Sequence, residues 1–460
     1  MPDQRKAEPG GDGAPRRPAG RRKVLIAAGI GVFVEYFDFA TYGFLATTLA
    51  HVFFPSTNTT VALLQTFGVY AVSYVVRPLG GLVFGHFGDR VGRTTTMAFA
   101  VVLMSLGTCL VGLLPGYATL GIAAPLLLVL CRLVQGFSAG GESYGAAVLL
   151  TEYAPPQRRG LYASVMPANS SLGLVSSALV SFLLSATLPA AVFATWGWRI
   201  PFLLAAPLGL IGLYLRLRLG ETPIFREVKN TSSVARAPVL RTLRRHYRQI
   251  FTVFGFAISA AVAPIFLTVY IVNYLTAKLH FSPAEALLAD AVTILVMFAF
   301  QPICGIISDR VGRKPVLIAG LAGLALLSVP SLLIIAEGSL LAAILGMCLL
   351  APLGAAVTVI LAVVSAEVFP TKVRYTGSAI SSNLSTTLFG GTAPLVATFL
   401  VAVTGSSLAP GFYVSAVSVV SLIVAIFALR ETNGDSLVRD QDLQPEDRSP
   451  VRADVITDAT

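Results

Sequence analysis

Charged side chains lie inside long apolar segments of this sequence, where an unpaired charge is costly. Two acids, Glu35 and Asp38, are three residues apart in one apolar run, so they share a face if that run is a helix. Arg77 and Arg132 lie within two later runs. A buried carboxyl group can bind and release a proton, and an arginine can hold its charge or anchor another carboxylate. These four residues are the first candidates for chemistry.

Two roles are open for these charges. We expect Asp38 and Glu35 to carry protons, with Arg132 or Arg77 as their alternating partner and as the anchor for a substrate carboxylate. The alternative is a fixed ion pair that braces two helices. Glu142 is also assigned to proton coupling, although Glu142 and Arg77 could instead support the loop at 85–93.

Uncharged polar residues lie on segments expected to face the same interior. The candidate substrate contacts are Tyr36, Tyr42, Gln135, Asn169, Tyr270, Asn273 and Asn383. Each of them could equally form a hydrogen bond between helices. The four cysteines fall in apolar runs without C-x-x-C spacing, and the four histidines are scattered, so we expect no metal site, disulfide or cofactor.

Composition places the chain in a lipid bilayer. Of its 460 residues, 55% are hydrophobic and only 12% are charged, whereas about 25% of residues are charged in soluble domains. Apolar runs long enough to cross a bilayer lie at roughly 24–50, 61–85, 95–114, 119–150, 161–186, 199–219, 250–276, 284–307, 315–335, 340–367, 377–403 and 411–429. This pattern predicts an all-α integral membrane protein with twelve transmembrane helices, six in each half.

Basic residues mark one side of the predicted bundle. All but four of the 33 Lys and Arg residues fall in the tails, the central segment or alternate loops, which makes both termini cytoplasmic. We expect disordered tails at 1–23 and 431–460, helix bundles at 24–219 and 250–430, and a cytoplasmic loop at 220–249 with a helix along the inner leaflet. The loop lacks the aromatic interleaving of a nucleic-acid site, despite the net charge of +10.

One charged loop occurs twice. G-H-F-G-D-R-V-G-R at 85–93 returns as G-I-I-S-D-R-V-G-R at 305–313, 220 residues later, and Glu152, Pro155 and Arg159 are echoed by Glu367, Pro370 and Arg374. Such duplication in an apolar chain is typical of transporters. We expect the loop to act as a gate through charge pairing at helix ends, the alternative being a turn that only fixes topology. The gate residues are Gly85, Asp89, Arg90, Gly92, Arg93, Asp309, Arg310, Gly312 and Arg313.

The sequence resembles the major facilitator superfamily and, within it, the metabolite:proton symporters. The resemblance covers nearly the whole chain outside its tails and is carried by E-Y-F-D-F-A-T-Y-G (35–43), R-P-L-G-G-L-V-F-G-H-F-G-D-R-V-G-R (77–93), R-L-V-Q-G-F-S-A-G-G-E (132–142), E-Y-A-P-P-Q-R-R-G (152–160), W-G-W-R-I-P-F (196–202) and R-L-R-L-G-E-T-P-I-F (216–225). It implies two six-helix bundles that rock about a central site, in a functional monomer of the bacterial plasma membrane.

The resemblance implies proton-driven import of a small carboxylated metabolite, with lipid, protons and that solute as partners. A zwitterion such as proline or a betaine is the alternative, although osmosensing relatives tend to carry a C-terminal coiled coil that this sequence lacks. Drug efflux is less favoured because the run 161–184 has no G-P-x-x-G-G motif. A membrane sensor without transport would predict an added soluble domain or lost intramembrane charges. We expect no enzyme, because no nucleophile, metal or phosphate-binding constellation is present.

Overall fold

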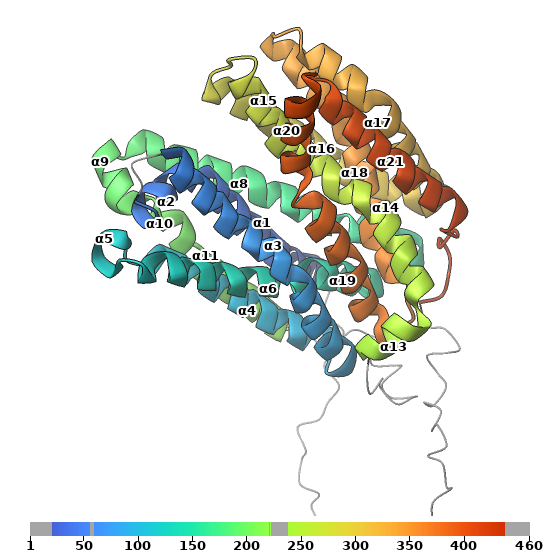
Figure 1. Ribbon diagram of the computed structural model, residues 1–460. Helices are drawn as coiled ribbons and strands as arrows, with labels where there is room; N and C mark the ends of the chain where they lie inside the picture. The colour runs from blue at the N-terminus through green and yellow to red at the C-terminus, as the bar shows by residue number, and fades with distance from the viewer. Residues whose placement is uncertain (1–20, 56–58, 220, 222–237, 438–460) are drawn as a thin grey trace, which may run out of the picture.

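The computed structural model describes residues 21–55, 59–219, 221 and 238–437, and every regular element in these residues is helical (Figure 1). Twelve helical segments are long and apolar enough to cross a membrane, as the sequence predicts. The first half contains α1 (Arg21–Phe44), α2 (Ala46–Phe53), α3 (Thr59–Arg90), α4 (Arg93–Leu113), α5 (Tyr117–Leu120), α6 (Ala123–Tyr153), η1 (Pro156–Arg158), α7 (Arg159–Ala163), α8 (Val165–Thr187), α9 (Ala190–Val192), η2 (Phe193–Gly197), α10 (Arg199–Leu203) and α11 (Ala205–Leu217).

The second half follows a short helix, α13. Its elements are α13 (Pro238–Arg245), α14 (Tyr247–Ile265), η3 (Phe266–Tyr270), α15 (Ile271–Ala277), α16 (Pro283–Val311), α17 (Arg313–Ile335), α18 (Leu340–Val368), η4 (Thr371–Val373), α19 (Arg374–Ser385), η5 (Thr386–Gly390), α20 (Ala393–Thr404) and α21 (Ala409–Phe427). Pro264 lies just before the π-turn η3, where its missing N–H favours a break in the helical hydrogen bonds.

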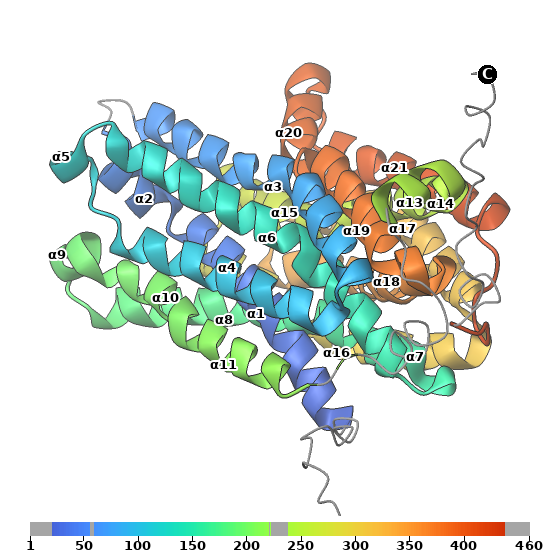
Figure 2. The ribbon, with the colours of Figure 1, turned by 90° about the horizontal axis from the view of Figure 1, so that it is seen from below.

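Each half forms its own bundle, and the two bundles meet at one end of the molecule. Within the halves, α3 packs on α6 and α17 packs on α18, whereas α19 packs on α3 and α16 on α7 across the halves. Figures 1 and 2 show the ribbons diverging toward α9 and α15 and approaching one another near α7, α13 and α19. We call the end where they meet the basic face, because it carries Arg90, Arg93, Arg158, Arg310 and Lys314.

The turns at the basic face depend on glycine. Gly92 joins α3 to α4 with φ 141°, and Gly312 joins α16 to α17 with φ 104°. Side chains with a Cβ rarely adopt such positive φ angles, so both copies of the repeated loop need glycine here. The repeat in the sequence is therefore a repeat in backbone geometry.

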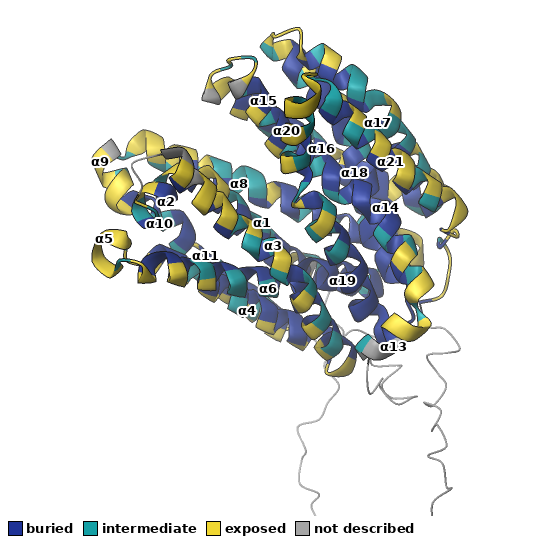
Figure 3. Cartoon of the chain, in the orientation of Figure 1, coloured by how far each residue is buried: buried dark blue, intermediate teal, exposed yellow. Residues whose placement is uncertain are grey.

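Burial separates the lipid-facing surface from the interior. Large apolar side chains on the outside remain exposed, including Leu64, Leu326 and Phe427 at 64%, 74% and 83%. Figure 3 shows exposed residues along the outer helices and buried ones where the bundles meet. An apolar exterior is compatible with the hydrocarbon of a bilayer. The helices also satisfy their own backbone hydrogen bonds, which a bilayer requires.

The structure places two boundaries a few residues away from those expected. The first helix begins at Arg21, so residues 21–23 are helical, and residues 1–20 lie outside the described part. The expectation of disorder from Glu431 onward fails for residues 431–437, which contact the basic face through Glu431, Asp435 and Leu437. Residues 222–237 and 438–460 lie outside the described part.

Candidate functional site

The first intramembrane ion pair joins α1 to α6. Arg132 Nη1 lies 2.9 Å from Asp38 Oδ2, and both side chains are fully buried. Gln135 Nε2 donates to the other oxygen of Asp38 at 2.8 Å and to Thr108 Oγ1 at 2.9 Å. Both carboxylate oxygens of Asp38 thus accept a hydrogen bond, which is what a charged carboxylate in an apolar interior requires.

The second ion pair joins α1 to α3. Arg77 Nη2 lies 2.9 Å from Glu35 Oε1, and Ser143 Oγ donates to Glu35 Oε2 at 2.7 Å. Each acid therefore has its own arginine, whereas the sequence left Arg77 and Arg132 as interchangeable partners. The side chain of Arg77 is 6% exposed and that of Glu35 is fully buried. This pair adjoins the opposite half, because Tyr74 O accepts a hydrogen bond from Thr387 Oγ1 at 2.9 Å.

Aromatic rings surround both guanidinium groups. Arg132 Cζ lies 4.5 Å from the centroid of Tyr42 and 5.4 Å from that of Tyr70. Arg77 Cζ lies 4.8 Å from the centroid of Tyr74. Because ring faces attract cations, these contacts replace part of the hydration that the arginines lose on burial.

Glu142 has a different partner from those expected. Its carboxylate forms a bidentate pair with Arg216, with Nη1 at 2.9 Å from Oε2, and Nη2 bonded to Oε1. Arg216 also donates to the carbonyls of Ala27 and Met97. This pair ties α1, α4, α6 and α11 together, so Glu142 does not support the loop at 85–93. Arg216 is fully buried in α11.

The uncharged candidates fall into several environments. Tyr36 is partly exposed on α1, whereas Tyr42 is buried and donates to Thr66 O. Asn169 and Asn273 donate to carbonyls of their own helices, those of Val165 and Val269. Such bonds within a helix are not evidence for ligand contact.

Two candidates and one unassigned acid lie elsewhere in the interior. Asn383 Nδ2 donates to Gly140 O at 2.6 Å, which links α19 to α6 across the halves. Tyr270 stacks between Phe266 and Tyr274. Asp290 is 6% exposed and makes no ion pair with any described residue. The structure therefore gathers Glu35, Asp38, Arg77, Arg132, Gln135 and Tyr42 and leaves the remaining candidates dispersed.

The two gate aspartates cap helices of the opposite half. Asp89 accepts hydrogen bonds from the backbone amides of Tyr375 and Thr376 at 3.0 and 2.8 Å, at the start of α19. Asp309 accepts from Gly160 and Leu161 at 2.8 and 2.9 Å, at the start of α7. A carboxylate at a helix N-terminus satisfies unpaired amides and is favoured by the helix dipole.

The gate arginines Arg93 and Arg313 join acids that the site assignment missed. Arg93 lies 3.4 Å from Asp89 and 3.2 Å from Glu152, and Arg374 of the second half lies 2.7 Å from Glu152. In the second half, Arg313 lies 3.3 Å from Glu367. The weaker echo in the sequence, which relates Glu152 to Glu367, carried this signal.

The symmetry of this network crosses the halves. Arg159 of the first half lies 3.7 Å from Glu367 of the second, just as Arg374 of the second reaches the first. Arg90 and Arg310, by contrast, are exposed and make no ion pair with any described residue. The ion pairs that we expected these two arginines to form in the gate are therefore not formed with any described residue.

Tyr375 fills a space between glycines of the first half. Its hydroxyl donates to Gly141 O at 2.8 Å. A Cβ on Gly88 would lie 1.9 Å from the ring, and one on Gly145 would lie 2.3 Å from the hydroxyl. Only glycine at these positions allows this close approach. Nothing in the sequence pattern pointed to Tyr375.

One glutamate follows the last span of each half. It caps the helix that starts after the gate loop of the same half. Glu221 Oε1 accepts from Arg93 N at 3.1 Å, and Glu431 accepts from Arg313 N at 2.9 Å and Lys314 N at 3.0 Å. Both glutamates precede a threonine, and this repeat is the signal in the sequence that could have predicted the two caps.

Residues 431–437 of the tail contact both halves. Asp435 O accepts from Arg159 at 2.6 Å, and Leu437 O accepts from Arg374 at 2.6 Å and from Thr371 at 2.9 Å. These carbonyls accept hydrogen bonds from arginines that also pair with Glu367 and Glu152. The tail is thus part of the closed basic face.

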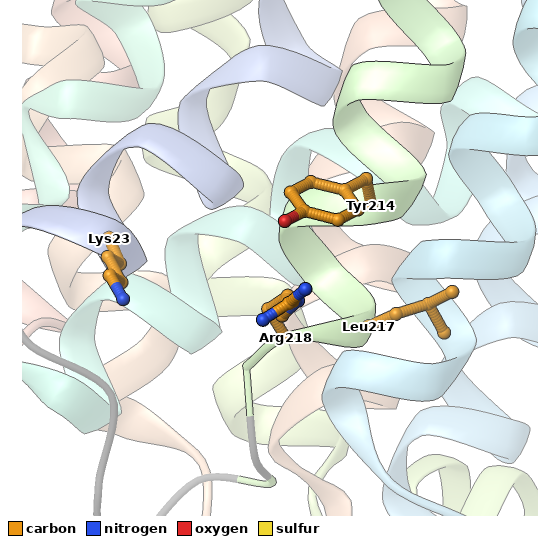
Figure 4. Close-up of a pocket in the computed structure, with 4 residues that line it drawn as sticks. All are labelled: Lys23, Tyr214, Leu217 and Arg218. Atoms are coloured by element: carbon orange, nitrogen blue, oxygen red, sulfur yellow. The ribbon is translucent and has the colours of Figure 1, made fainter.

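An open pocket lies away from these pairs, between the start of α1 and the end of α11. Figure 4 shows Lys23, Tyr214, Leu217 and Arg218 around it. It shares no residue with either intramembrane pair, so we assign it no part in the site. Among the described residues no cluster of His, Cys, Asp and Glu has the grouping of a metal site, and the four cysteines are free.

Comparison with known proteins gives consistent matches along the chain. A family model described as "Sugar (and other) transporter" matches residues 23–246 and again residues 224–441. A "Proline/betaine transporter" of Salmonella typhimurium is 37% identical over 420 residues, covering 89% of this chain and 84% of the relative. An "Ectoine/proline transporter ProP" of Corynebacterium glutamicum is 37% identical over 415 residues, covering 86% and 82%.

A third relative and a solved structure extend the comparison. The "Glycine betaine/proline/ectoine/pipecolic acid transporter OusA" of Dickeya dadantii is 36% identical over 420 residues, covering 89% of this chain and 83% of the relative. The structure of the proton:xylose symporter XylE bound to 6-bromo-6-deoxy-D-glucose has a TM-score of 0.74 at 19% identity, covering 92% and 98% of the two chains. At that identity the likeness establishes the fold alone.

Proposed function

Because the chain belongs to the sugar (and other) transporter family of the major facilitator superfamily, we propose that it imports a small zwitterionic osmolyte together with protons. It is a multi-pass protein of the bacterial plasma membrane. Transport would proceed by alternating access, with the basic face cytoplasmic and closed in this structure.

The relatives favour a zwitterion over the simple carboxylate that the sequence favoured first. Three of them, from different bacteria, are described as transporters of proline, betaine or ectoine. This is the single observation that carries the choice of substrate, and it replaces the organic-acid expectation by its alternative.

The second ion pair has chemistry that suits such a solute. Arg77 can receive a carboxylate, and Glu35 together with the face of Tyr74 can receive a cationic group. A zwitterion could thus replace both partners of the Glu35–Arg77 pair without leaving a charge unpaired. The pair is also beside the opposite half, through the bond of Thr387 to Tyr74.

Asp38 and Arg132 are proposed as the proton-coupling pair. Both are sealed among neighbours here, so Asp38 would have to exchange its proton in another state of the cycle. A charged carboxylate paired with Arg132 suits the present state, and loss of that pairing would favour the protonated acid. Glu142 is not part of this proposal, because its bidentate pair with Arg216 has the form of a brace.

The repeated loops are proposed as the cytoplasmic gate. In this structure Asp89 and Asp309 each hold a helix of the opposite half by two backbone hydrogen bonds. Opening the basic face would break all four bonds. Rupture of charge-assisted bonds has to be offset by new contacts on the other side of the membrane.

The proposal is tested with the full-length protein in proteoliposomes. Uptake of labelled proline, glycine betaine, ectoine and a panel of simple carboxylates is measured with and without an inward proton gradient. We expect the zwitterions to accumulate, and to do so only with the gradient. Accumulation of the carboxylates alone would restore the organic-acid hypothesis, and uptake that ignores the gradient would exclude symport.

A further inference from the structure

Phe39 lies between the two intramembrane ion pairs. It follows Asp38 directly and lies one turn beyond Glu35 on α1, and its side chain is 4% exposed. Its neighbours on α1 thus hold the acidic partner of each pair. The side chain of Phe39 has no hydrogen-bonding group, so it can act on the pairs only through its ring.

Both arginines contact the ring of Phe39. Arg77 Cζ lies 4.5 Å from the ring centroid, and Arg132 Cζ lies 4.8 Å from the same centroid. Arg77 comes from α3 and Arg132 from α6, so one aromatic side chain contacts a cation from each of two helices. No other described ring has a guanidinium from both pairs over it.

The position of the ring is fixed by other aromatic residues. Tyr70 and Tyr74 approach Phe39 edge to face, with centroids at 5.8 and 5.3 Å and interplanar angles of 76° and 68°. This arrangement is the favoured one for aromatic pairs. A ring held in this way cannot follow one arginine without disturbing its contacts with the other.

The ring completes the environment of two incompletely bonded cations. The Nε atoms of Arg77 and Arg132 are buried and have no hydrogen-bond acceptor among the described residues. Arg77 is held by its ion pair with Glu35 and by aromatic faces, without a hydrogen bond to a described residue. In a water-poor interior, the attraction of a ring face for a cation is stronger than at an exposed site.

We propose that Phe39 couples the substrate pair Glu35–Arg77 to the proton pair Asp38–Arg132, as a positioning residue that both arginines share. The inference rests on the proposed function. When a substrate carboxylate draws Arg77 away from Glu35, the ring is left to Arg132 alone. Arg132 then moves toward the ring and away from Asp38, which leaves Asp38 free to accept a proton. Release of the substrate reverses these steps.

Two variants separate the aromatic face from the volume of the side chain. Phe39→Leu keeps an apolar side chain but removes the ring, and Phe39→Tyr keeps the ring. Phe37→Leu is the matched control, because Phe37 is a buried residue of the same helix that stacks on Phe33, 6.0 Å away, and has no guanidinium over its ring among the described contacts. It therefore removes the same atoms from α1 without touching either pair.

The experiment measures two activities in the same proteoliposomes. Counterflow of labelled proline or glycine betaine at equal pH reports binding and conformational exchange, and accumulation under an inward proton gradient reports coupling. We expect Phe39→Leu to lower the ratio of accumulation to counterflow about tenfold, the scale of a desolvated cation–π contact. We expect Phe39→Tyr and Phe37→Leu to keep the wild-type ratio within about twofold.

The outcomes distinguish this inference from the proposed function. Wild-type vesicles that fail to accumulate either solute with the gradient overturn the proposed function and the inference with it. If the wild type accumulates solute, an unchanged ratio in Phe39→Leu overturns the inference alone, as does an equal loss of both activities. Should Phe39→Leu not reach the membrane in folded form, Phe39→Met serves as the ring-free variant, with the same expected ratio.

Discussion

At the scale of single residues, buried charges in this chain serve two different purposes. Asp38 and Glu35 each face one arginine within an aromatic group, and the Glu35–Arg77 pair lies beside a helix of the other half. Glu142 instead meets Arg216 in a pair saturated by backbone carbonyls. Residue type alone does not separate these roles, because all three acids lie in apolar helices. The partners separate them.

Asp38→Asn is expected to abolish accumulation driven by the proton gradient and to preserve exchange of preloaded substrate. The amide oxygen of Asn can still accept a hydrogen bond from Arg132 or Gln135, but the side chain cannot carry a proton. Counterflow and gradient-driven uptake in the same vesicles measure the two properties. Asp38 is not the proton carrier if accumulation survives the substitution.

Glu142→Gln is expected to destabilise the fold by about 3–5 kcal/mol, because it leaves Arg216 buried without its counter-charge. Thermal unfolding in detergent measures the loss. The double variant Glu142→Leu with Arg216→Met removes both charges and should recover much of it. A Gln variant as stable as the wild type that has lost proton coupling would return Glu142 to the proton pathway.

At the scale of elements, each copy of the sequence repeat contacts the copy in the other half. The Glu of each echo pairs with the Arg of the other, as Glu152 with Arg374 and Glu367 with Arg159. The aspartates of the two gate loops likewise cap α19 and α7, not the helices that follow them in sequence. A repeat placed in two facing bundles brings each copy to the other because the bundles are related by approximate twofold symmetry.

Asp89→Asn is expected to open the basic face more often, since the amide loses the charge that favours the start of α19. The probe is a cysteine placed at Ala379, which is fully buried beside Gly81, in a background without the four native cysteines. We expect its labelling by an impermeant thiol reagent from the basic face to rise roughly fivefold to a hundredfold, the effect of about 1–3 kcal/mol.

Arg90→Gln is the matched control for that experiment, because Arg90 is the next residue and is exposed without an ion pair to any described residue. Its labelling rate should equal that of the parent protein. Equal rates in Asp89→Asn and the parent would show that Asp89 does not hold the gate closed.

At the scale of the whole molecule, the chain beyond the last span contacts the basic face. Glu431 caps α17, and the carbonyl of Leu437 receives Arg374 beside the gate acids. Burial acts to raise the pKa of Glu431, but backbone hydrogen bonds, from the start of α17 and from the tail itself, outweigh it and hold that pKa below the ordinary value of 4.5. A lowered carboxyl pKa stabilises the fold above the ordinary value, and this stabilisation is lost as the pH falls through the lowered one.

Glu431→Gln is therefore expected to lower the melting temperature at pH 7 and to have less effect as the pH falls below 4.5. The shift should be small, because Glu431 is exposed and solvent screens its charge. Melting temperatures of both proteins in detergent across this range test the sign. A difference that grows on acidification would exclude the proposed capping role of Glu431.

The number of spans, the two-half plan and the residues that carry charge in the membrane followed from the sequence. Hydrocarbon admits only satisfied helices, so apolar length alone predicts the twelve spans. Repeated motifs such as D-R-V-G-R can be read directly in the sequence, and they indicate the two-half plan. The glycines at positive φ can also be recognised from the sequence, since few other residues adopt that conformation.

Only the tertiary structure decided which charge meets which. Glu35 to Arg77, Asp38 to Arg132 and Glu142 to Arg216 are pairings between helices distant in sequence, and the direction of each side chain depends on helix rotation and packing. The shared ring of Phe39 and the insertion of Tyr375 among glycines depend on the same packing. Periodicity places a residue on a face, but the partner of that face is set by how whole helices fit together.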